Sequence, residues 1–174
     1  MLEQITPLII TYNESPNIDR VLQQLTWAKE IIIIDSYSSD ETLDIIAAYP
    51  QAKVIQNLFE SFASQCNFGL SKIESEWVLS LDADYILSQA LIDEIQSISD
   101  TSNIDAYIVP FKYCVFGKAL RGTLYPPRKV LYRRNKVVYE NDGHAHRAII
   151  DGSIESLINY IYHDDRKPDR KSVV

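Results

Sequence analysis

Four short apolar runs alternate with four helical patterns over the first hundred residues, and this alternation limits the possible folds more than any other feature. The expected strands are Ile5–Thr11, Glu30–Asp35, Ala52–Gln56 and Glu76–Leu81. Apolar residues recur at helical spacing in segments 18–25, 43–47, 61–73 and 91–98. A β-α-β-α series of this length predicts an α/β fold with an open, mostly parallel sheet and helices on both faces.

The pattern changes after residue 105. Strands separated by irregular loops are expected at Ala106–Phe116, Lys129–Arg134, Val137–Tyr139, Arg147–Ile150 and Leu157–Tyr162. The length of 174 residues predicts a single domain, to which we assign residues 1–165. Residues 166–174 have little to pack against, and we expect a tail or a truncated end there.

Charge is distributed unevenly along the chain. The net charge of −7 argues against a general nucleic-acid binder. Residues 1–105 carry 17 acidic and 4 basic residues, whereas residues 112–136 carry 8 basic residues and no acidic one. A basic stretch is usually a solvated face, but after an acidic half it is also a candidate anion site.

Cysteine content and hydropathy predict the cellular compartment. Cys66 and Cys114 lie among apolar residues and are expected in the core of a protein from a reducing compartment. The N-terminus lacks the pattern of a signal peptide, and the aliphatic run Ile31–Ile34 is too short to span a membrane. We therefore expect the protein in the cytoplasm. The sequence does not indicate an oligomeric state.

Polar side chains follow three of the predicted strands. Asp82 and Asp84 end the fourth strand, Thr11, Tyr12 and Glu14 end the first, and Asp35 ends the second. In a sheet of order 3-2-1-4 these groups meet at the carboxyl ends of the strands, where open α/β sheets bind their ligands. Carboxylate oxygens suit Mg²⁺ or Mn²⁺, which commonly bind substrate phosphates as well.

Each of these acidic residues also has a structural interpretation. Asp-x-Asp is common in exposed turns after strands. Glu14 can stabilise the first turn of a helix through the helix dipole. Asp35 can cap a turn, but Ser38 has capping-box spacing with Glu41, so we expect Asp35 to be available to a ligand.

The histidines and the missing motifs narrow the chemistry further. His144 and His146 lie in one short segment with Glu140 and Asp142, which together offer a general base. No nitrogen and sulfur cluster of the kind that zinc prefers is evident. The sequence also lacks Gly-x-Gly-x-x-Gly, Gly-x-x-x-x-Gly-Lys and Gly-x-Ser-x-Gly, which disfavours dinucleotide oxidoreductases, P-loop enzymes and α/β-hydrolases.

Taken together, these motifs resemble family 2 glycosyltransferases, and most of all the bacterial branch related to lipopolysaccharide-core β-glucosyltransferases. The resemblance runs from about Pro7 to about His163. It is carried by four pieces of sequence, Leu8–Glu14, Ile31–Ser36 with Ser39–Thr42, Gln65–Leu70 and Trp77–Tyr85. It implies a GT-A fold with a nucleotide-sugar-binding half at 1–105, an acceptor half at 106–165, a divalent cation, and inversion at the anomeric carbon.

The resemblance also implies roles for individual residues. Thr11, Tyr12 and Glu14 would line the nucleoside pocket, and Asp35 would bind the base. Asp82 would face the ribose or the metal, and Asp84 would bind the metal between the diphosphate oxygens. Relatives often carry a His-Glu pair where this chain has His146-Arg147, so the catalytic base is open. Asp142 is our first candidate and His146 the second, while Arg128 is the candidate cation for the leaving diphosphate.

The resemblance suggests a UDP-sugar by default and a glycan or lipid-linked acceptor of the cell envelope, with peripheral contact at the inner face of the membrane. Three alternatives stay open. A nucleotidyltransferase would need a glycine-rich basic loop after the first strand, which segment 11–17 lacks. A receiver-like signalling module would leave the second half unexplained. A catalytically inactive sugar-nucleotide-binding domain would account for the missing glutamate.

Overall fold

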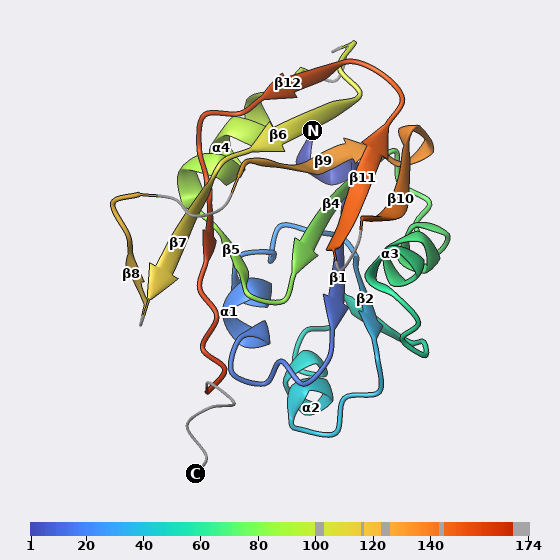
Figure 1. Cartoon of the computed structure of the whole chain (residues 1–174), viewed down its shortest axis with the longest axis vertical. Coiled ribbons are helices and arrows are strands. Elements are labelled where there is room, and N and C mark those ends of the chain that lie inside the picture. Colours follow the sequence, from blue (N-terminus) through green and yellow to red (C-terminus); the bar gives the residue numbers. More distant parts are fainter. Residues whose placement is uncertain (100–102, 116, 123–125, 143–144, 169–174) are drawn as a thin grey trace.

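A seven-stranded sheet forms the centre of the molecule (Figure 1). A computed structural model describes every residue except 100–102, 116, 123–125, 143–144 and 169–174, and describes only the backbone of Asp142, Ala145 and His146. The sheet order is β12-β6-β9-β4-β1-β2-β3. The order 3-2-1-4 that the sequence predicts for the first four strands is therefore confirmed.

The first four strands run parallel and end at similar heights. They are β1 (Ile5–Thr11), β2 (Ile31–Asp35), β3 (Ala52–Gln56) and β4 (Trp77–Asp82). The register pairs Thr11 with Asp35 and Ile10 with Asp82. The polar residues at the ends of β1, β2 and β4 thus share one edge of the sheet, as the sequence predicts.

Three further strands complete the large sheet. They are β6 (Ala106–Val109), β9 (Arg128–Arg133) and β12 (Ile154–Ser156). Strand β9 runs antiparallel to both β4 and β6, and β12 runs parallel to β6. The expected strand Ala106–Phe116 is divided at Pro110, and β7 (Phe111–Val115) leaves for a second sheet.

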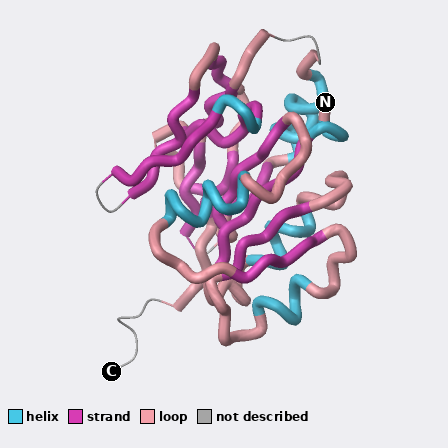
Figure 2. Tube along the Cα trace, turned by 90° about the vertical axis from the view of Figure 1, so that its right-hand side faces the viewer, coloured by secondary structure: helices cyan, strands magenta, loops and turns pink. Residues whose placement is uncertain are grey.

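Helices cover both faces of the sheet because its central strands are apolar on both sides. In β2, Ile31 and Ile33 pack into one core cluster while Ile32 and Ile34 pack into the other. The first cluster includes residues of α1 (Ile18–Gln23), α2 (Thr42–Ile46) and α4 (Gln89–Ser97), and the second includes residues of α3 (Phe62–Leu70). Figure 2 shows the strands between these helices.

The second half adds a four-stranded sheet and a two-stranded ribbon. The smaller sheet has the order β5-β13-β7-β8 and contains β5 (Tyr85–Leu87), β8 (Lys118–Ala119) and β13 (Ile161–His163). The ribbon pairs β10 (Val137–Asp142) with β11 (Ala145–Ile150) and packs beside α3. Two short 3-10 turns occur at Leu2–Gln4 and Arg134–Lys136.

Some local predictions differ from the structure. The expected strand Leu157–Tyr162 is confirmed only at Ile161 and Tyr162, which belong to β13, because β12 ends at Ser156 and residues 157–160 form no strand. Helix α2 begins at Thr42 without a Ser38 capping box, and Asp40 instead accepts a hydrogen bond from the Thr42 amide at 3.1 Å. No helix in the described part of the chain is long and apolar enough to cross a membrane. The assignment of residues 1–165 to one domain stays a prediction.

Candidate functional site

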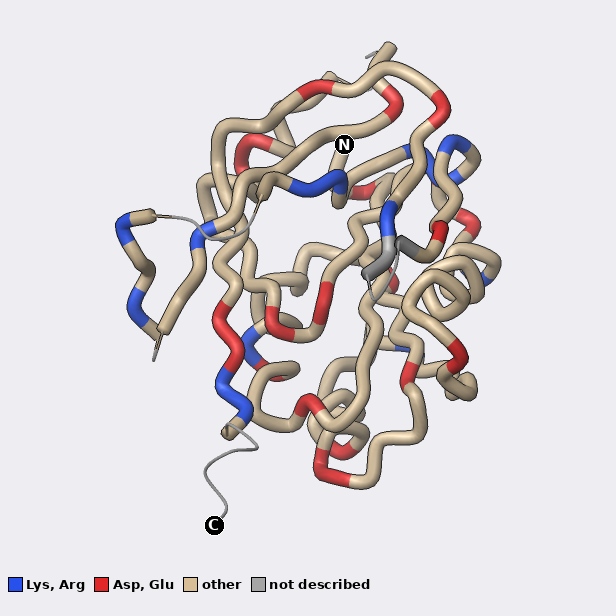
Figure 3. The backbone as a smooth tube through the Cα atoms, viewed as in Figure 1, with Lys and Arg blue, Asp and Glu red and all other residues tan. Residues whose placement is uncertain are grey.

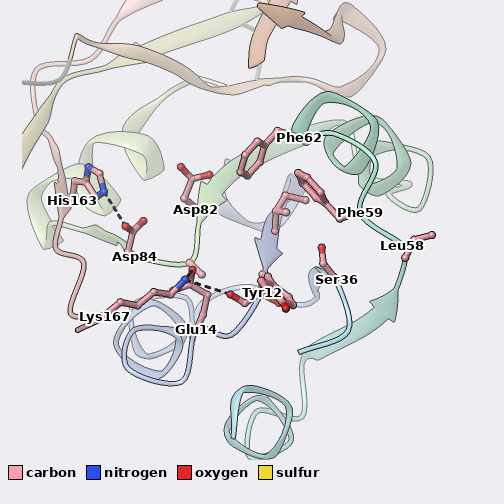
Figure 4. A pocket seen from close by; sticks show the side chains of 13 residues that line it. Tyr12, Glu14, Ser36, Leu58, Phe59, Phe62, Asp82, Asp84, His163 and Lys167 are labelled. Atoms are coloured by element: carbon pink, nitrogen blue, oxygen red, sulfur yellow. Dashed lines mark hydrogen bonds and ion pairs between the residues drawn. The ribbon is translucent and has the colours of Figure 1, made fainter. Parts of the chain in front are cut away.

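A cleft of about 690 Å³ opens at the carboxyl ends of β1 and β4 (Figure 4). It lies where strand order reverses in the parallel part of the sheet, between β1 and β4. Its lining residues are Ile10, Thr11, Tyr12, Glu14, Ser36, Leu58, Phe59, Phe62, Asp82, Ala83, Asp84, His163 and Lys167. Five of the predicted site residues, from Thr11 to Asp84, therefore line one cleft.

Asp84 and His163 form the best-defined polar pair in this cleft. The imidazole Nε2 lies 2.9 Å from Asp84 Oδ2, and both side chains are largely buried. Antiparallel pairing of β13 with β5 sets His163 opposite Tyr85, one residue after Asp84. Burial alone lowers the pKa of His163, but the hydrogen bond and charge of Asp84, with the charges of Asp82 and Asp165, raise it overall.

Asp82 ends β4 and interacts with a buried tyrosine. Burial, followed by the nearby Asp82 carboxylate and its hydrogen bond, raises the pKa of the Tyr85 hydroxyl. The same hydroxyl accepts a hydrogen bond from Arg128 Nη1 at 3.1 Å. Tyr85 thus connects the first aspartate of the Asp-x-Asp motif to the cation that the sequence analysis selects.

Asp82 also borders a second cavity. This cavity has a volume of about 320 Å³, and its lining includes Asp82, Tyr85, Arg128 and Arg147. Arg128 lines the second cavity and is absent from the lining of the main cleft. Its assignment to the leaving diphosphate stays a prediction.

Tyr12 and Glu14 also line the main cleft, and Glu14 lies close enough to Asp84 for the charge of that carboxylate to raise its pKa. The Tyr12 side chain is exposed. Glu14 accepts a hydrogen bond from Asn17 Nδ2 at 2.9 Å and forms an ion pair with Lys167. Burial raises the pKa of Glu14, and the contacts with Lys167 and Asn17 oppose this shift only in part. These groups present hydrogen-bonding atoms and an aromatic side chain at the cleft, and their binding of a nucleoside stays a prediction.

Asp35 is buried and hydrogen-bonded within the protein, although the sequence predicts a carboxylate that is available to a ligand. Its side chain is fully buried and is absent from the lining of the cleft. Its carboxylate accepts hydrogen bonds from Thr11 Oγ1 at 3.0 Å, Ser38 Oγ at 2.5 Å and Gln56 Nε2 at 3.3 Å. These bonds join the ends of β1, β2 and β3, whereas the binding of a base by Asp35 stays a prediction.

The side chains at the cleft fit a hard divalent cation that takes its remaining ligands from the phosphates of a bound substrate. Asp82 and Asp84 offer carboxylate oxygens, and His163 offers a nitrogen. Among the residues described, no three His, Cys, Asp or Glu side chains converge into a ready metal site. Mg²⁺ and Mn²⁺ sites of the phosphate-binding kind use one or two carboxylates and complete the shell with phosphate and water, so this sparse set suits them.

The two candidates for the catalytic base are placed only by their backbones. Asp142 pairs with Ala145 and Asn141 pairs with His146 at the open end of the ribbon β10–β11. The side chains of Asp142 and His146 lie outside what the structure describes, as does residue 144. Arg147, which follows His146, lines the second cavity. Their catalytic roles stay predictions.

Two titratable residues of the cleft, His163 and Lys167, have no role predicted from the sequence. His163 is distant in sequence from the Asp-x-Asp motif, and the pairing of β13 with β5 brings the two together. Lys167 was assigned to a tail. The segment 164–167 instead packs against α1, where Arg20 donates to Asp164 Oδ2 at 2.6 Å. All four residues of this segment are charged, and this was the one sequence signal that it could form ion pairs with the rest of the chain.

Comparison with known proteins decides the family. Residues 7–149 match the family described as Glycosyl transferase family 2. The chain belongs to this family. It is 36% identical over 109 residues to an uncharacterized glycosyltransferase of Rickettsia bellii, a match covering 62% of this chain and 37% of the relative. It is 28% identical over 138 residues to the lipopolysaccharide core biosynthesis glycosyltransferase LpsC of Rhizobium meliloti, covering 75% and 48%.

Solved structures of similar fold bear out the GT-A architecture. Staphylococcus aureus TarS 1-349 in complex with UDP-GlcNAc superposes with a TM-score of 0.72 at 20% identity, covering 98% of this chain and 61% of that one. Glucosyl-3-phosphoglycerate synthase from Mycobacterium tuberculosis, solved with Mn²⁺, UDP and phosphoglyceric acid, gives 0.65 at 14% identity, covering 94% and 71%. The predicted fold class and family are confirmed.

Proposed function

We propose that this family 2 chain transfers a sugar from a UDP-sugar to a hydroxyl group of an acceptor, with inversion at the anomeric carbon and with a divalent cation. The observation that carries the proposal is the cleft at the ends of β1 and β4, which unites Asp82, Asp84 and His163 with Tyr12 and Glu14. A similarly folded protein was solved with UDP-GlcNAc, and another with UDP and Mn²⁺. The chain spans 37% of the Rickettsia bellii relative's length, so the proposal concerns this part of such a protein.

The cleft divides naturally between the two ends of the donor. Tyr12, Glu14 and Ser36 would bind the nucleoside, and Asp84 with His163 would lie near the diphosphate. Asp84 and Asp82 would hold Mg²⁺ or Mn²⁺, which when bound neutralises the charge that develops on the leaving diphosphate. Lys167 lines the same cleft and adds a positive charge near Glu14.

Inverting transfer is a single displacement. A bond forms between the acceptor oxygen and the anomeric carbon while the bond from that carbon to the β-phosphate oxygen breaks. UDP leaves, and the proton of the acceptor hydroxyl passes to a base on the acceptor side, for which we keep Asp142 first and His146 second. Much of the rate should come from holding the two reactants in line.

The acceptor is proposed from the relatives and from the fold. LpsC is named for lipopolysaccharide core biosynthesis, which favours a cell-envelope glycan or lipid-linked acceptor here. Such an acceptor would place the protein at the inner face of the membrane. This assignment is an analogy within the family.

A second candidate function rests on one observation. Arg147 occupies the position at which relatives of the expected branch often carry a glutamate, and it lines the second cavity. A chain without a working base would bind a sugar nucleotide without transferring it.

Phosphorylation of Asp35, as in a receiver-like module, is disfavoured because this carboxylate is fully buried.

Asp84→Asn tests the proposed function. We expect this change to lower metal-dependent UDP release in the presence of acceptors by at least about a hundredfold, because the amide loses the negative charge that holds the cation. The melting temperature should stay near that of the parent chain. Asp93→Asn, at an exposed position of α4, is the matched control and should leave UDP release unchanged.

The donor is identified by thermal shift with UDP-, GDP-, CDP- and TDP-sugars, each with and without Mn²⁺. A UDP-sugar that stabilises the chain only with Mn²⁺ would support the proposal. Stabilisation by the donor without UDP release from any acceptor would favour the inactive binding domain. Equal UDP release by the parent chain and by Asp84→Asn would contradict the role of Asp84.

A further inference from the structure

The second cavity is a basic pocket in an acidic protein. It has a volume of about 320 Å³ and lies against β9 and the ribbon β10–β11. Among the side chains that the structure describes, its lining includes three cationic ones, Arg128, Lys129 and Arg147, and one carboxylate, that of Asp82. The whole chain carries a net charge of −7, so this local excess of positive charge does not follow from composition. Figure 3 shows basic residues on β9 and β11 near the centre of the molecule.

The three cations come from two separate elements that the fold brings together. Arg128 and Lys129 begin β9, and Arg147 lies in β11. Lys129 Nζ donates to the Ala148 carbonyl oxygen at 3.4 Å, which links β9 to the ribbon. Glu140 faces Arg147 across the ribbon but is absent from the lining. The described part of the lining therefore carries a net positive charge.

Neutral hydroxyl groups form another part of the wall. Tyr139 and Ser80 both line the cavity, and the Tyr139 hydroxyl donates to Ser80 Oγ at 3.0 Å. Guanidinium groups bind phosphate or carboxylate oxygens with two parallel hydrogen bonds, and a lysine adds a point charge. The combination of two arginines, one lysine and hydroxyls matches an oxyanion better than it matches a neutral sugar.

The position of this pocket relates it to the donor cleft. Asp82 lines both cavities, so the two meet at this residue. Direct transfer requires the acceptor oxygen to lie next to the anomeric carbon of the donor. A ligand in the second cavity would lie beside a donor whose diphosphate is near Asp84. We propose that the second cavity binds the acceptor through an anionic group, a phosphate or a carboxylate, held by Arg128, Lys129 and Arg147.

This inference rests on the proposed glycosyl transfer and specifies the acceptor class. The competing assignment gives the same cations to the leaving diphosphate. Against it, Arg128, Lys129 and Arg147 line the second cavity and not the main cleft, whereas Lys167 lines the main cleft. The cations are thus separated from the donor side by Asp82, on which the two cavities border.

Binding of inorganic phosphate to the chain saturated with UDP and Mg²⁺ tests the inference without knowledge of the acceptor. Because UDP fills the donor cleft, calorimetry then reports a second anion site. We expect phosphate to bind, and Lys129→Glu or Arg147→Glu to weaken it by at least about tenfold through charge repulsion. Lys53→Glu, on exposed β3 at the far edge of the sheet, is the matched control and should leave phosphate binding unchanged.

The outcomes separate the two proposals. Affinity for UDP should be the same in the parent chain and in Arg147→Glu; absence of UDP binding in the parent chain would count against the donor site itself. If UDP binds but phosphate does not, or if phosphate binds equally to Arg147→Glu and the parent chain, the anionic acceptor site is wrong. Arg147→Gln, which removes the charge without reversing it, should give an intermediate loss and guards against misfolding of the Glu variants.

A last experiment determines whether the anionic group belongs to a lipid headgroup or to a soluble or glycan acceptor. Sedimentation with phosphatidylglycerol vesicles, but not with phosphatidylcholine vesicles, would assign the pocket to a lipid headgroup if Arg147→Glu abolished it. Phosphate binding without vesicle binding would assign it to a phosphate on a soluble or glycan acceptor. Both results support an anionic acceptor and differ only in what carries the charge.

Discussion

The Asp35 carboxylate joins three strands at the edge of the sheet that carries the site. It is fully buried and accepts hydrogen bonds from Thr11, Ser38 and Gln56. Ser38 contributes both its amide at 2.9 Å and its hydroxyl. A buried carboxylate that accepts from several donors contributes to stability mainly because its removal leaves those donors unsatisfied.

We therefore expect Asp35→Ala to lower the free energy of unfolding by about 2 to 4 kcal/mol. Urea denaturation measures this change. Asp44→Ala, an exposed carboxylate on α2, is the control and should change the free energy by less than about 0.5 kcal/mol. A normal stability together with a loss of UDP binding would instead assign Asp35 wholly to the ligand.

At the scale of elements, the packing of α3 on β1 depends on one glycine. A Cβ atom added at Gly69 would lie 2.5 Å from Leu8 Cδ1 and 3.1 Å from Ile34 Cγ1. Leu8 and Ile34 are fully buried, so they have little room to move. Glycine in this helix lowers its intrinsic propensity, and the close approach of the helix to the sheet outweighs that cost.

Gly69→Ala is accordingly expected to destabilise the chain by about 1 to 2 kcal/mol, since overpacking a full core costs more than the gain in helix propensity. Urea denaturation is again the measurement. Gly122→Ala has open space around its Cβ position and should be neutral. Adding Leu8→Val to Gly69→Ala should recover part of the loss, because it removes a methylene from the crowded contact. An increase in stability for Gly69→Ala would refute this account of the packing.

A strand of this fold can be predicted from the sequence when its own residues form a recognisable apolar pattern. The strands β1 to β4 are predictable from apolar runs and helical spacing, because a doubly covered parallel sheet needs strands that are apolar on both faces, whereas their order came with the expected fold class. Strand β5 is not predicted and β13 is predicted only in part, since each has three residues and forms by pairing with distant partners. His163 enters the cleft through that pairing, so no local pattern could place it.

The same reasoning applies to the capping of α2. Ser38 and Glu41 have the spacing of a capping box, yet Ser38 turns back to bind Asp35. A buried carboxylate at the end of β2 competes for the Ser38 donors, and this competition is visible only once the strand and the turn are folded together. Here the hydrogen bonds from Ser38 to the buried Asp35 carboxylate replace the capping box that the local sequence predicts.

For the whole molecule, Asn17 links the start of α1 to the C-terminal segment 164–167. This side chain is fully buried. Its amide donates to Glu14 Oε2 at 2.9 Å and to Asp165 Oδ1 at 2.8 Å, and its carbonyl oxygen accepts from Arg20 Nη2 at 2.7 Å and from the Arg166 amide at 2.9 Å. Asn17 thus fixes the C-terminal segment 164–167 on α1 beside the cleft without lining the cleft itself.

We expect Asn17→Ala to weaken UDP binding about threefold to tenfold and to lower the free energy of unfolding by about 2 to 4 kcal/mol, because Glu14 and Lys167 lose the contacts that position them and several buried partners lose theirs. Calorimetry below the melting temperature separates the two effects. Gln23→Ala, an exposed change on the same helix, should leave both quantities unchanged. If Asn17→Ala bound UDP as tightly as the parent chain, segment 164–167 would be a structural closure alone, and the nucleoside end of the cleft would depend only on the first half of the chain.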